Sequence, residues 1–351
     1  MLLNPRRLPH LPARYTRKLD LPIKNKSLLA YRQAICAQVL MTVLLIFSTS
    51  AAAENSGVRE YQFEPVDASR SRTVPLKIYY RPSPRPQPVI LYSHGLGGSR
   101  TNNGYLGRHW AAGGYIAVFM QHAGSDEQVW KSAPREKRRE TLFLAANIQN
   151  FLHRNRDVSF VIDTLEVWNR HQAHVLNGSM DLSRIGMSGH SFGAVTTLSV
   201  AGQKFRGNRS FPEPRIHAFL AISPSPSKRL SHEESFGHLH QPILLMTGTH
   251  DGSPVNPALM PAARLEVYKA LPATDKFQLV LKGGTHFAFS DKPRYQNQRN
   301  PVHHRAIQAI SLKFWEAYLG GAADAKSWLQ SRAPIRETEL VADDVWQWKD
   351  G

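Results

Sequence analysis

A serine flanked by glycines gives this sequence its strongest chemical signal. The stretch "RIGMSGHSFGAVTTLSVAG" (184–202) joins a short apolar run to an Ala/Val/Leu-rich run through Gly189-x-Ser191-x-Gly193. Where a strand turns sharply into a helix, such glycines remove the Cβ atoms that would collide with neighbouring backbone. The serine oxygen then stands exposed, and the N–H of Phe192 at the helix N-terminus can stabilise an oxyanion. The pattern predicts a nucleophilic serine, and an ordinary glycine turn is the alternative.

A second glycine-rich turn lies early in the chain. The segment "SHGLGGS" (93–99) follows an apolar run, and its glycines would let the backbone approach a ligand closely. The N–H of Leu96 is therefore expected to be the second oxyanion donor, beside that of Phe192. We expect His94 to shape this loop and not to carry a proton. A tight strand–helix turn without function is the alternative.

The base and the acid should follow the serine in the order acid, then histidine. His286 in "KGGTHFAFSD" follows the last predicted strand, from which a loop can place its imidazole over the serine. Asp251 ends the preceding strand and is followed by turn-forming residues, so its carboxylate could orient that imidazole. Weaker competitors for the two roles are His250, Asp291 and Asp126.

Residues near these turns are expected to line a substrate pocket. Our candidates are His122, Trp130 and Phe287, although core packing is an equal alternative for the phenylalanine. The histidines lack ligand spacing alongside carboxylates or thiols, so we expect no metal site. The proposed chemistry also requires no cofactor.

Alternating apolar and helical segments position these residues. An antiparallel pair of strands should open the domain, and buried strands should alternate with helices afterwards. Such alternation implies a mostly parallel sheet covered by helices on both faces. The segment 223–238 is the loosest internal stretch and is expected to cross the edge of the sheet. The predicted strands are 58–65, 73–82, 88–95, 115–122, 184–189, 216–223, 242–251 and 276–284, and the predicted helices are 101–114, 134–172, 194–202, 257–271 and 303–319.

The N-terminal 53 residues differ in composition from the remainder. They hold eight Lys/Arg against one acid, and residues 35–53 are apolar and end in small residues. This order predicts a secretory signal cleaved after Ala51-x-Ala53, and hence a secreted or periplasmic protein. An uncleaved membrane anchor formed by 35–53 is the alternative. Residues 54–351 are then expected to form a single catalytic domain.

Charge and cysteine content exclude other classes of function. The only cysteine, Cys36, lies in the predicted signal, so the exported domain has no cysteine nucleophile. The formal net charge is +17, but no nucleic-acid recognition motif accompanies it. We therefore expect no nucleic-acid partner. The positive charge is expected to keep the protein soluble and to attract it to anionic surfaces. The sequence does not indicate the oligomeric state.

Two segments resemble a known family. "SHGLGGSRTNNGYLGRHWAAGGYIAVFMQHAGSD" and "GHSFGAVTT" look like the platelet-activating factor acetylhydrolases and predicted dienelactone-hydrolase-like esterases, serine hydrolases of the α/β-hydrolase fold. The resemblance covers most of residues 58–319. It implies that Leu96 and Phe192 form the oxyanion hole and that Ser191, Asp251 and His286 form the triad.

The chain departs from that family in two respects. The acetylhydrolases carry their acid after the strand that follows the nucleophile helix, where this chain has Ser223 and no carboxylate. True dienelactone hydrolases use a cysteine nucleophile, which is absent here. The departures favour Asp251 as the acid and leave the substrate open.

The sequence as a whole predicts an exported serine hydrolase. It would cleave carboxylic esters of small or lipid-like molecules through an acyl-enzyme intermediate. Amide, peptide or polyester hydrolysis on the same residues is the nearest alternative. A non-catalytic surface-binding module is the alternative from a different class.

Overall fold

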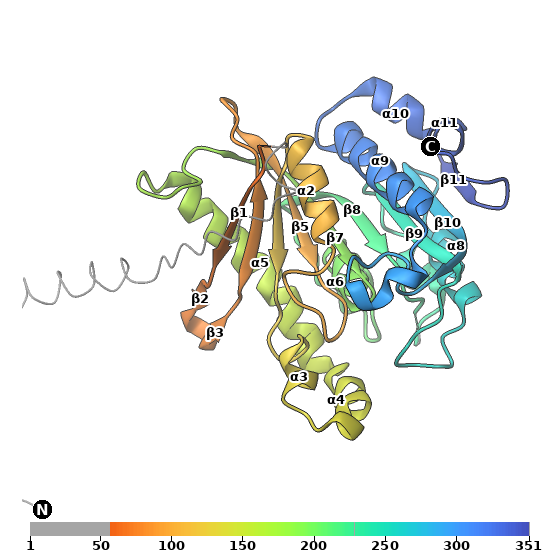
Figure 1. Cartoon of the computed structure of the whole chain (residues 1–351), viewed down its shortest axis with the longest axis horizontal. Helices are drawn as coiled ribbons and strands as arrows, with labels where there is room; N and C mark the ends of the chain where they lie inside the picture. Colours follow the sequence, from red (N-terminus) through yellow and green to blue (C-terminus); the bar gives the residue numbers. More distant parts are fainter. Residues whose placement is uncertain (1–56, 228, 351) are drawn as a thin grey trace, which may run out of the picture. The chain divides into compact units, whose positions relative to one another are not determined.

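A nine-stranded sheet forms the centre of the protein (Figure 1). The computed structural model describes residues 57–350 except residue 228, and all of them belong to one compact unit. The strand order is β1-β4-β6-β5-β7-β8-β9-β10-β11. From β6 to β10 all neighbours are parallel, whereas β4 and β11 run against their neighbours. The strands are β1 (Arg59–Phe63), β4 (Leu76–Tyr80), β5 (Gln87–Ser93), β6 (Ile116–Met120), β7 (Met180–His190), β8 (Ile216–Ile222), β9 (Ile243–His250), β10 (Lys276–Thr285) and β11 (Val345–Lys349), and β2 (Val66–Asp67) pairs separately with β3 (Arg72–Thr73).

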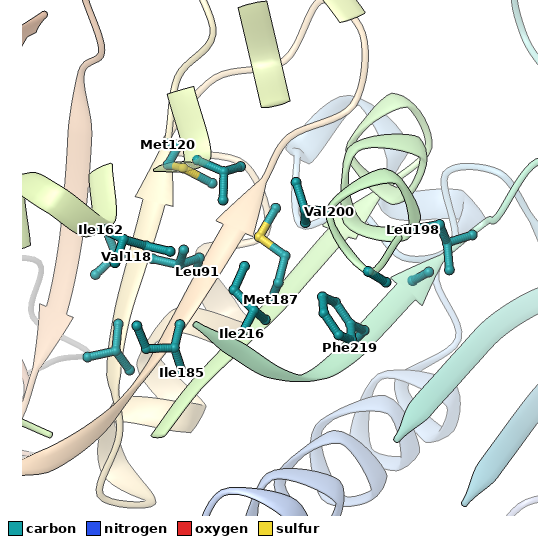
Figure 2. Packing of buried hydrophobic residues seen from close by; sticks show 14 of the residues in the cluster. Leu91, Val118, Met120, Ile162, Ile185, Met187, Leu198, Val200, Ile216 and Phe219 are labelled. Carbon is teal, nitrogen blue, oxygen red and sulfur yellow. The ribbon is translucent and has the colours of Figure 1, made fainter. Parts of the chain in front are cut away.

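Helices cover both faces of the sheet. Alternation along each strand explains why both faces are apolar: in β5, Val89 and Leu91 enter one cluster, whereas Ile90 and Tyr92 enter the other. The first cluster also takes residues from α5, α6 and α8, and the second takes residues from α2 and α9. Figure 2 shows part of the first cluster. The α-helices are α2 (Gly104–Ala112), α3 (Gln128–Lys131), α4 (Arg138–Ala145), α5 (Ile148–Arg170), α6 (Phe192–Val200), α7 (His232–Phe236), α8 (Leu265–Ala270), α9 (Pro301–Tyr318), α10 (Ala323–Leu329) and α11 (Ala333–Glu337), and single 3₁₀ turns lie at 68–70, 135–137, 261–264 and 293–298.

The prediction of a mostly parallel sheet with helices on both faces is confirmed. Every predicted apolar run forms a strand, and the predicted opening pair is the antiparallel pair β1 and β4. The predicted helix 257–271 is shorter, because Pro261 starts a 3₁₀ turn and α8 begins only at Leu265. The segment 223–238 contains α7, whose start is fixed by a capping box between Ser231 and Glu234. The elements β2, α3, α10, α11 and β11 were not predicted.

The parallel strands bring the chemically interesting turns to one edge. The segments after β5, β7, β9 and β10 all leave the carboxyl ends of the sheet, where ligands bind in open α/β sheets. The predicted signal or anchor, residues 1–53, lies outside the described residues. Among the described helices, none is long and apolar enough to cross a membrane.

Candidate active site

Ser191 occupies a strained turn between β7 and α6. Its φ is 58° and its ψ is −114°, a left-handed conformation that is costly for a residue other than glycine. Glycines make the turn possible, because a Cβ at Gly193 would overlap the carbonyl oxygen of Ser93 and one at Gly189 would overlap that of Gly193. The amide of Ser191 donates to the carbonyl of Ile222 on β8 at 2.9 Å, which holds the turn against the sheet.

His286 and Asp251 lie beside this serine. The Ser191 hydroxyl and His286 Nε2 are 2.9 Å apart, and His286 Nδ1 lies 2.7 Å from Asp251 Oδ1. With Asp251 ionised, Nδ1–H donates to the carboxylate, so Nε2 is free to accept the proton of the serine. The three residues predicted from sequence therefore form a continuous hydrogen-bonded chain.

The carboxylate of Asp251 is fully buried and held on several sides. Thr247 Oγ1 donates to its second oxygen at 2.9 Å, and Arg264 Nε lies 3.1 Å from the oxygen that faces His286. Burial raises the pKa of Asp251, but the hydrogen bond from His286 and the charges of His286 and Arg264 outweigh it, so its pKa is lowered. The carboxylate remains ionised across the neutral range.

Arg264 joins three loops beneath the site. Its guanidinium donates to the backbone carbonyls of Asp251 at 2.6 Å, Ser223 at 2.7 Å and Pro224 at 3.0 Å, and one terminal nitrogen lies 3.3 Å from His286 Nδ1. The end of β8, which carries no carboxylate in this chain, is thus connected to the acid after β9 and to the histidine loop. Arg264 was not among the residues predicted from sequence.

Two backbone N–H groups at the cavity are available to a ligand. Leu96 and Phe192 line the same cavity as Ser191, and neither of their N–H groups has a hydrogen-bond acceptor among the described residues. The groups around Leu96 are engaged: Gly97 N–H donates to Ser125 at 2.9 Å, and the Gly97 carbonyl accepts from Trp130 Nε1 at 2.8 Å. The loop is therefore fixed while the N–H of Leu96 stays available.

A buried arginine contacts the two segments that carry the N–H groups of Leu96 and Phe192. Arg154 of α5 donates to the carbonyl of His94 and, at 3.1 Å, to Ser93 Oγ, and its guanidinium carbon lies 4.6 Å from the centre of the Phe192 ring. Burial lowers the pKa of Arg154 to about 9, against the opposing charge of Asp157, so the side chain is still charged at neutral pH. One cation thus contacts both of the segments that carry the available N–H groups of Leu96 and Phe192.

His94 has the structural role expected of it. Its Nδ1–H donates to the Gly95 carbonyl at 2.6 Å, and its Nε2 accepts from the His122 amide at 3.0 Å. Burial holds the pKa of His94 far below its usual range, so the ring is neutral.

A large cavity opens beside Ser191. Its volume is about 1360 Å³, and its walls come mainly from α4, the start of α5, and the segments 203–211, 225–230 and 253–259. The supposed edge excursion 223–238 is thus partly a wall of this cavity. The residues of the wall are mostly apolar, and they include Ser191, Phe192 and Leu96.

The three predicted pocket residues lie elsewhere. His122 is fully buried, and its Nδ1–H donates to Asp157 on α5 at 2.9 Å. Trp130 supports the oxyanion loop through Gly97, as described above. Phe287 stacks on Tyr295 with ring centres 3.9 Å apart. None of the three is among the residues that line the cavity.

The weaker candidates for acid and base are used otherwise. Asp291 accepts from the amides of Asn103 at 2.9 Å and Tyr105 at 3.4 Å, at the start of α2. Asp126 accepts from Gln121 at 2.8 Å, and the His250 side chain is exposed. Within the described residues, no group of three or more His, Cys, Asp or Glu side chains could hold a metal ion.

Comparison with known proteins supports the architecture. No family model matches the chain, and no curated protein matches it. Among solved structures, the chain is similar to a ferulic acid esterase from Streptomyces cinnamoneus, with a TM-score of 0.54 and 18% sequence identity, covering 76% of this chain and 92% of that one. The chain has the α/β-hydrolase fold. At this identity the α/β-hydrolase likeness concerns the fold alone, and function has to be argued from the site.

His190 is a further residue of the site that was not predicted from sequence. It occupies the variable position before the serine, and its Nε2–H donates to the His286 backbone carbonyl at 3.1 Å. Burial lowers its pKa to about 3, so it is a neutral support for the histidine loop. The sequence shows that His190 lies next to the serine in "GHSFG". It does not show that His190 contacts a residue 96 positions later in the chain.

Proposed function

We propose that this protein is a serine hydrolase that cleaves carboxylic esters. One observation carries the proposal: the hydrogen-bonded chain from Ser191 through His286 to the buried Asp251 opens on a large cavity. The strained serine between close-packed glycines supports it, because such strain is typical of functional sites. The solved structure with a similar fold is named an esterase, which agrees with this chemistry.

In the proposed reaction Ser191 Oγ attacks the ester carbonyl while His286 Nε2 takes its proton. The N–H groups of Leu96 and Phe192 stabilise the negative oxygen of the tetrahedral intermediate. His286 then returns the proton to the leaving alcohol, and an acyl group remains on the serine. Water, deprotonated by the same imidazole, releases the carboxylic acid and restores the enzyme.

The narrower resemblance to the acetylhydrolases and dienelactone-hydrolase-like esterases stays a prediction. So does export, since residues 1–53 lie outside the described part of the chain. We propose a cleaved signal, which predicts a mature N-terminus close to Glu54 in the exported protein. An N-terminus before Leu40 would contradict cleavage.

A fluorophosphonate probe tests the proposal. It should label the wild-type protein at Ser191 and leave Ser191→Ala unlabelled, because only an activated serine attacks phosphorus quickly. Ser253→Ala is the matched control, since Ser253 lines the same cavity but belongs to neither the triad nor the oxyanion site. Equal labelling of wild type and Ser191→Ala would refute the assignment of the nucleophile.

A further inference from the structure

The cavity beside Ser191 has an apolar corner near its mouth. Phe143, Leu144 and Ile148, where α4 meets α5, line the cavity and are 60%, 62% and 66% exposed. Three large apolar side chains within six residues, all exposed at a cavity, are unusual for a solvent-facing surface and mark a place where an apolar group binds. We call these three residues the apolar corner.

Other parts of the wall carry positive charge. Arg206 and Arg209 come from the loop between α6 and β8, and Arg229 comes from the loop before α7. All three are exposed, and among the described residues no carboxylate lies within ion-pair distance of them. We call them the rim arginines.

A neighbouring arginine shows the contrast with the rim arginines. Arg215, on the same connection between α6 and β8, contacts the carboxylates of Asp163 at 2.6 Å, Glu166 at 3.0 Å and Glu213 at 2.8 Å. By contrast, no aspartate or glutamate is present among the described residues that line the cavity. The wall therefore combines apolar surface with uncompensated guanidinium groups.

We propose that the ester hydrolysed at Ser191 is an anionic amphiphile. Its apolar chain lies against the apolar corner, and its carboxylate, phosphate or sulfate group lies against the rim arginines. Guanidinium groups suit such anions because their planar fork matches two acceptor oxygens at once. This inference rests on the proposed function and adds the substrate class to it.

Two matched pairs of chromogenic esters test the inference. In the first, para-nitrophenyl hexanoate is compared with the analogue bearing a carboxylate on the nitrophenyl ring. In the second, para-nitrophenyl nonanoate is compared with the mono-para-nitrophenyl ester of nonanedioic acid. The pairs place the anion on the alcohol side or at the end of the acyl chain, and each rate is divided by the rate of hydroxide-catalysed hydrolysis.

We expect the wild type to prefer the anionic member of at least one pair by about tenfold in kcat/KM, since exposed ion pairs contribute up to about fivefold each. The preference should lie in KM, because the contact is present before and during reaction. It should weaken as salt is added. In the variant with all rim arginines changed to Gln, the ratio should fall to about one.

The matched control removes the same charge elsewhere. Arg59, Arg85 and Arg336 are exposed, form no ion pair among the described residues and do not line the cavity. Changing these three to Gln should leave the anionic preference intact. Equal kcat/KM for charged and neutral esters, a preference that survives loss of the rim arginines, or a preference lost in the control would each overturn the inference.

Binding without turnover separates this inference from the proposed function. In Ser191→Ala, calorimetry should show decanoate binding about tenfold more tightly than when the rim arginines are also changed to Gln. A protein that hydrolyses no ester but binds decanoate in this way would refute the function and support the ligand class. A protein that hydrolyses neutral esters but shows no arginine-dependent binding of decanoate would support the proposed function and refute the ligand class.

The anionic ester could be a free molecule or a lipid in a membrane. Vesicles of phosphatidylglycerol, with phosphatidylcholine vesicles as the neutral comparison, distinguish the two sources. Release of fatty acid from phosphatidylglycerol, reduced by loss of the rim arginines, identifies the membrane as the source. Hydrolysis of the soluble anionic esters alone identifies a free molecule as the substrate. Either result supports an anionic amphiphile as the substrate class.

Discussion

The buried guanidinium of Arg264 lies 3.1 Å from the Asp251 carboxylate and donates to the same residue's carbonyl at 2.6 Å. A cation next to the acid of a triad stabilises the ionised carboxylate. It also fixes the loop after β9 against the end of β8. Arg264 therefore positions the acid both electrostatically and through backbone contacts.

Changing Arg264 to Met should move the pH dependence of activity. Without the nearby positive charge of the guanidinium, the hydrogen-bonded pair of Asp251 and His286 takes up a proton more readily, so the acid limb of kcat/KM shifts to higher pH. We expect kcat/KM near neutrality to fall about tenfold, or about 1.4 kcal/mol. Arg264→Lys keeps a charge, so its acid limb should stay close to that of the wild type. A Met variant whose loss of rate leaves the acid limb unmoved would show that the guanidinium acts only as a structural support.

Asp251→Asn should lower kcat severely. The amide cannot hold the Nδ1–H tautomer of His286, and the same change in a serine protease triad lowers kcat by a factor of about 10⁴. Asp291→Asn is the matched control, because the Asp291 carboxylate accepts from backbone amides at the start of α2 and, among the described residues, from no side chain. Its kcat should be near normal, with a loss of about 1 kcal/mol in stability, because one of the two accepting oxygens is replaced by an amide nitrogen. If Asp291→Asn lost most of its kcat while Asp251→Asn stayed near normal, Asp291 would be the acid.

Trp130→Phe should weaken the oxyanion site without breaking it. The change removes the 2.8 Å hydrogen bond to the Gly97 carbonyl, a contribution of about 1 kcal/mol, and should lower kcat about fivefold with little change in KM. Trp328→Phe is the control, since its Nε1 donates at 2.7 Å to Glu337 on α11, away from the site. Equal kcat values in the two variants would argue against a role for Trp130 in the loop.

The protein should lose stability in mildly acidic solution. Burial lowers the pKa of His122 to about 4 and that of His190 to about 3, whereas both rise to the ordinary value of about 6.5 on unfolding. Between about pH 6.5 and 4 the unfolded chain thus binds more protons, so the free energy of unfolding decreases as pH falls, by about 1.4 kcal/mol per pH unit for each histidine. Urea unfolding at several pH values measures the slope. A free energy of unfolding that stays constant across this window would contradict buried neutral histidines.

The features predictable from sequence were local ones. Apolar runs bounded by glycine gave the strands, and Gly189 and Gly193 predicted the elbow because a side chain at either position would overlap backbone. The order of acid and histidine followed from the topology. Asp251 and His286 could therefore be chosen although 35 residues separate them.

The features that escaped prediction depend on contacts between distant segments. Nothing in "PAARLE" shows that Arg264 reaches across to Ser223, and nothing near Arg154 shows that it contacts His94. His122 was expected in the pocket because it lies near the predicted turns, but its ring is fully buried and donates to Asp157 on α5. Residue type and position along the chain do not reveal the direction of such side chains.

The most direct test of the account is a search for the acyl-enzyme on Ser191. Wild-type protein is mixed with para-nitrophenyl hexanoate, quenched in acid during turnover and analysed as intact protein and as peptides by mass spectrometry. The account predicts one hexanoyl group, carried by the peptide that contains Ser191, and no adduct in Ser191→Ala. Undiminished ester hydrolysis by Ser191→Ala, or an acyl group on another residue of the wild type, would contradict it.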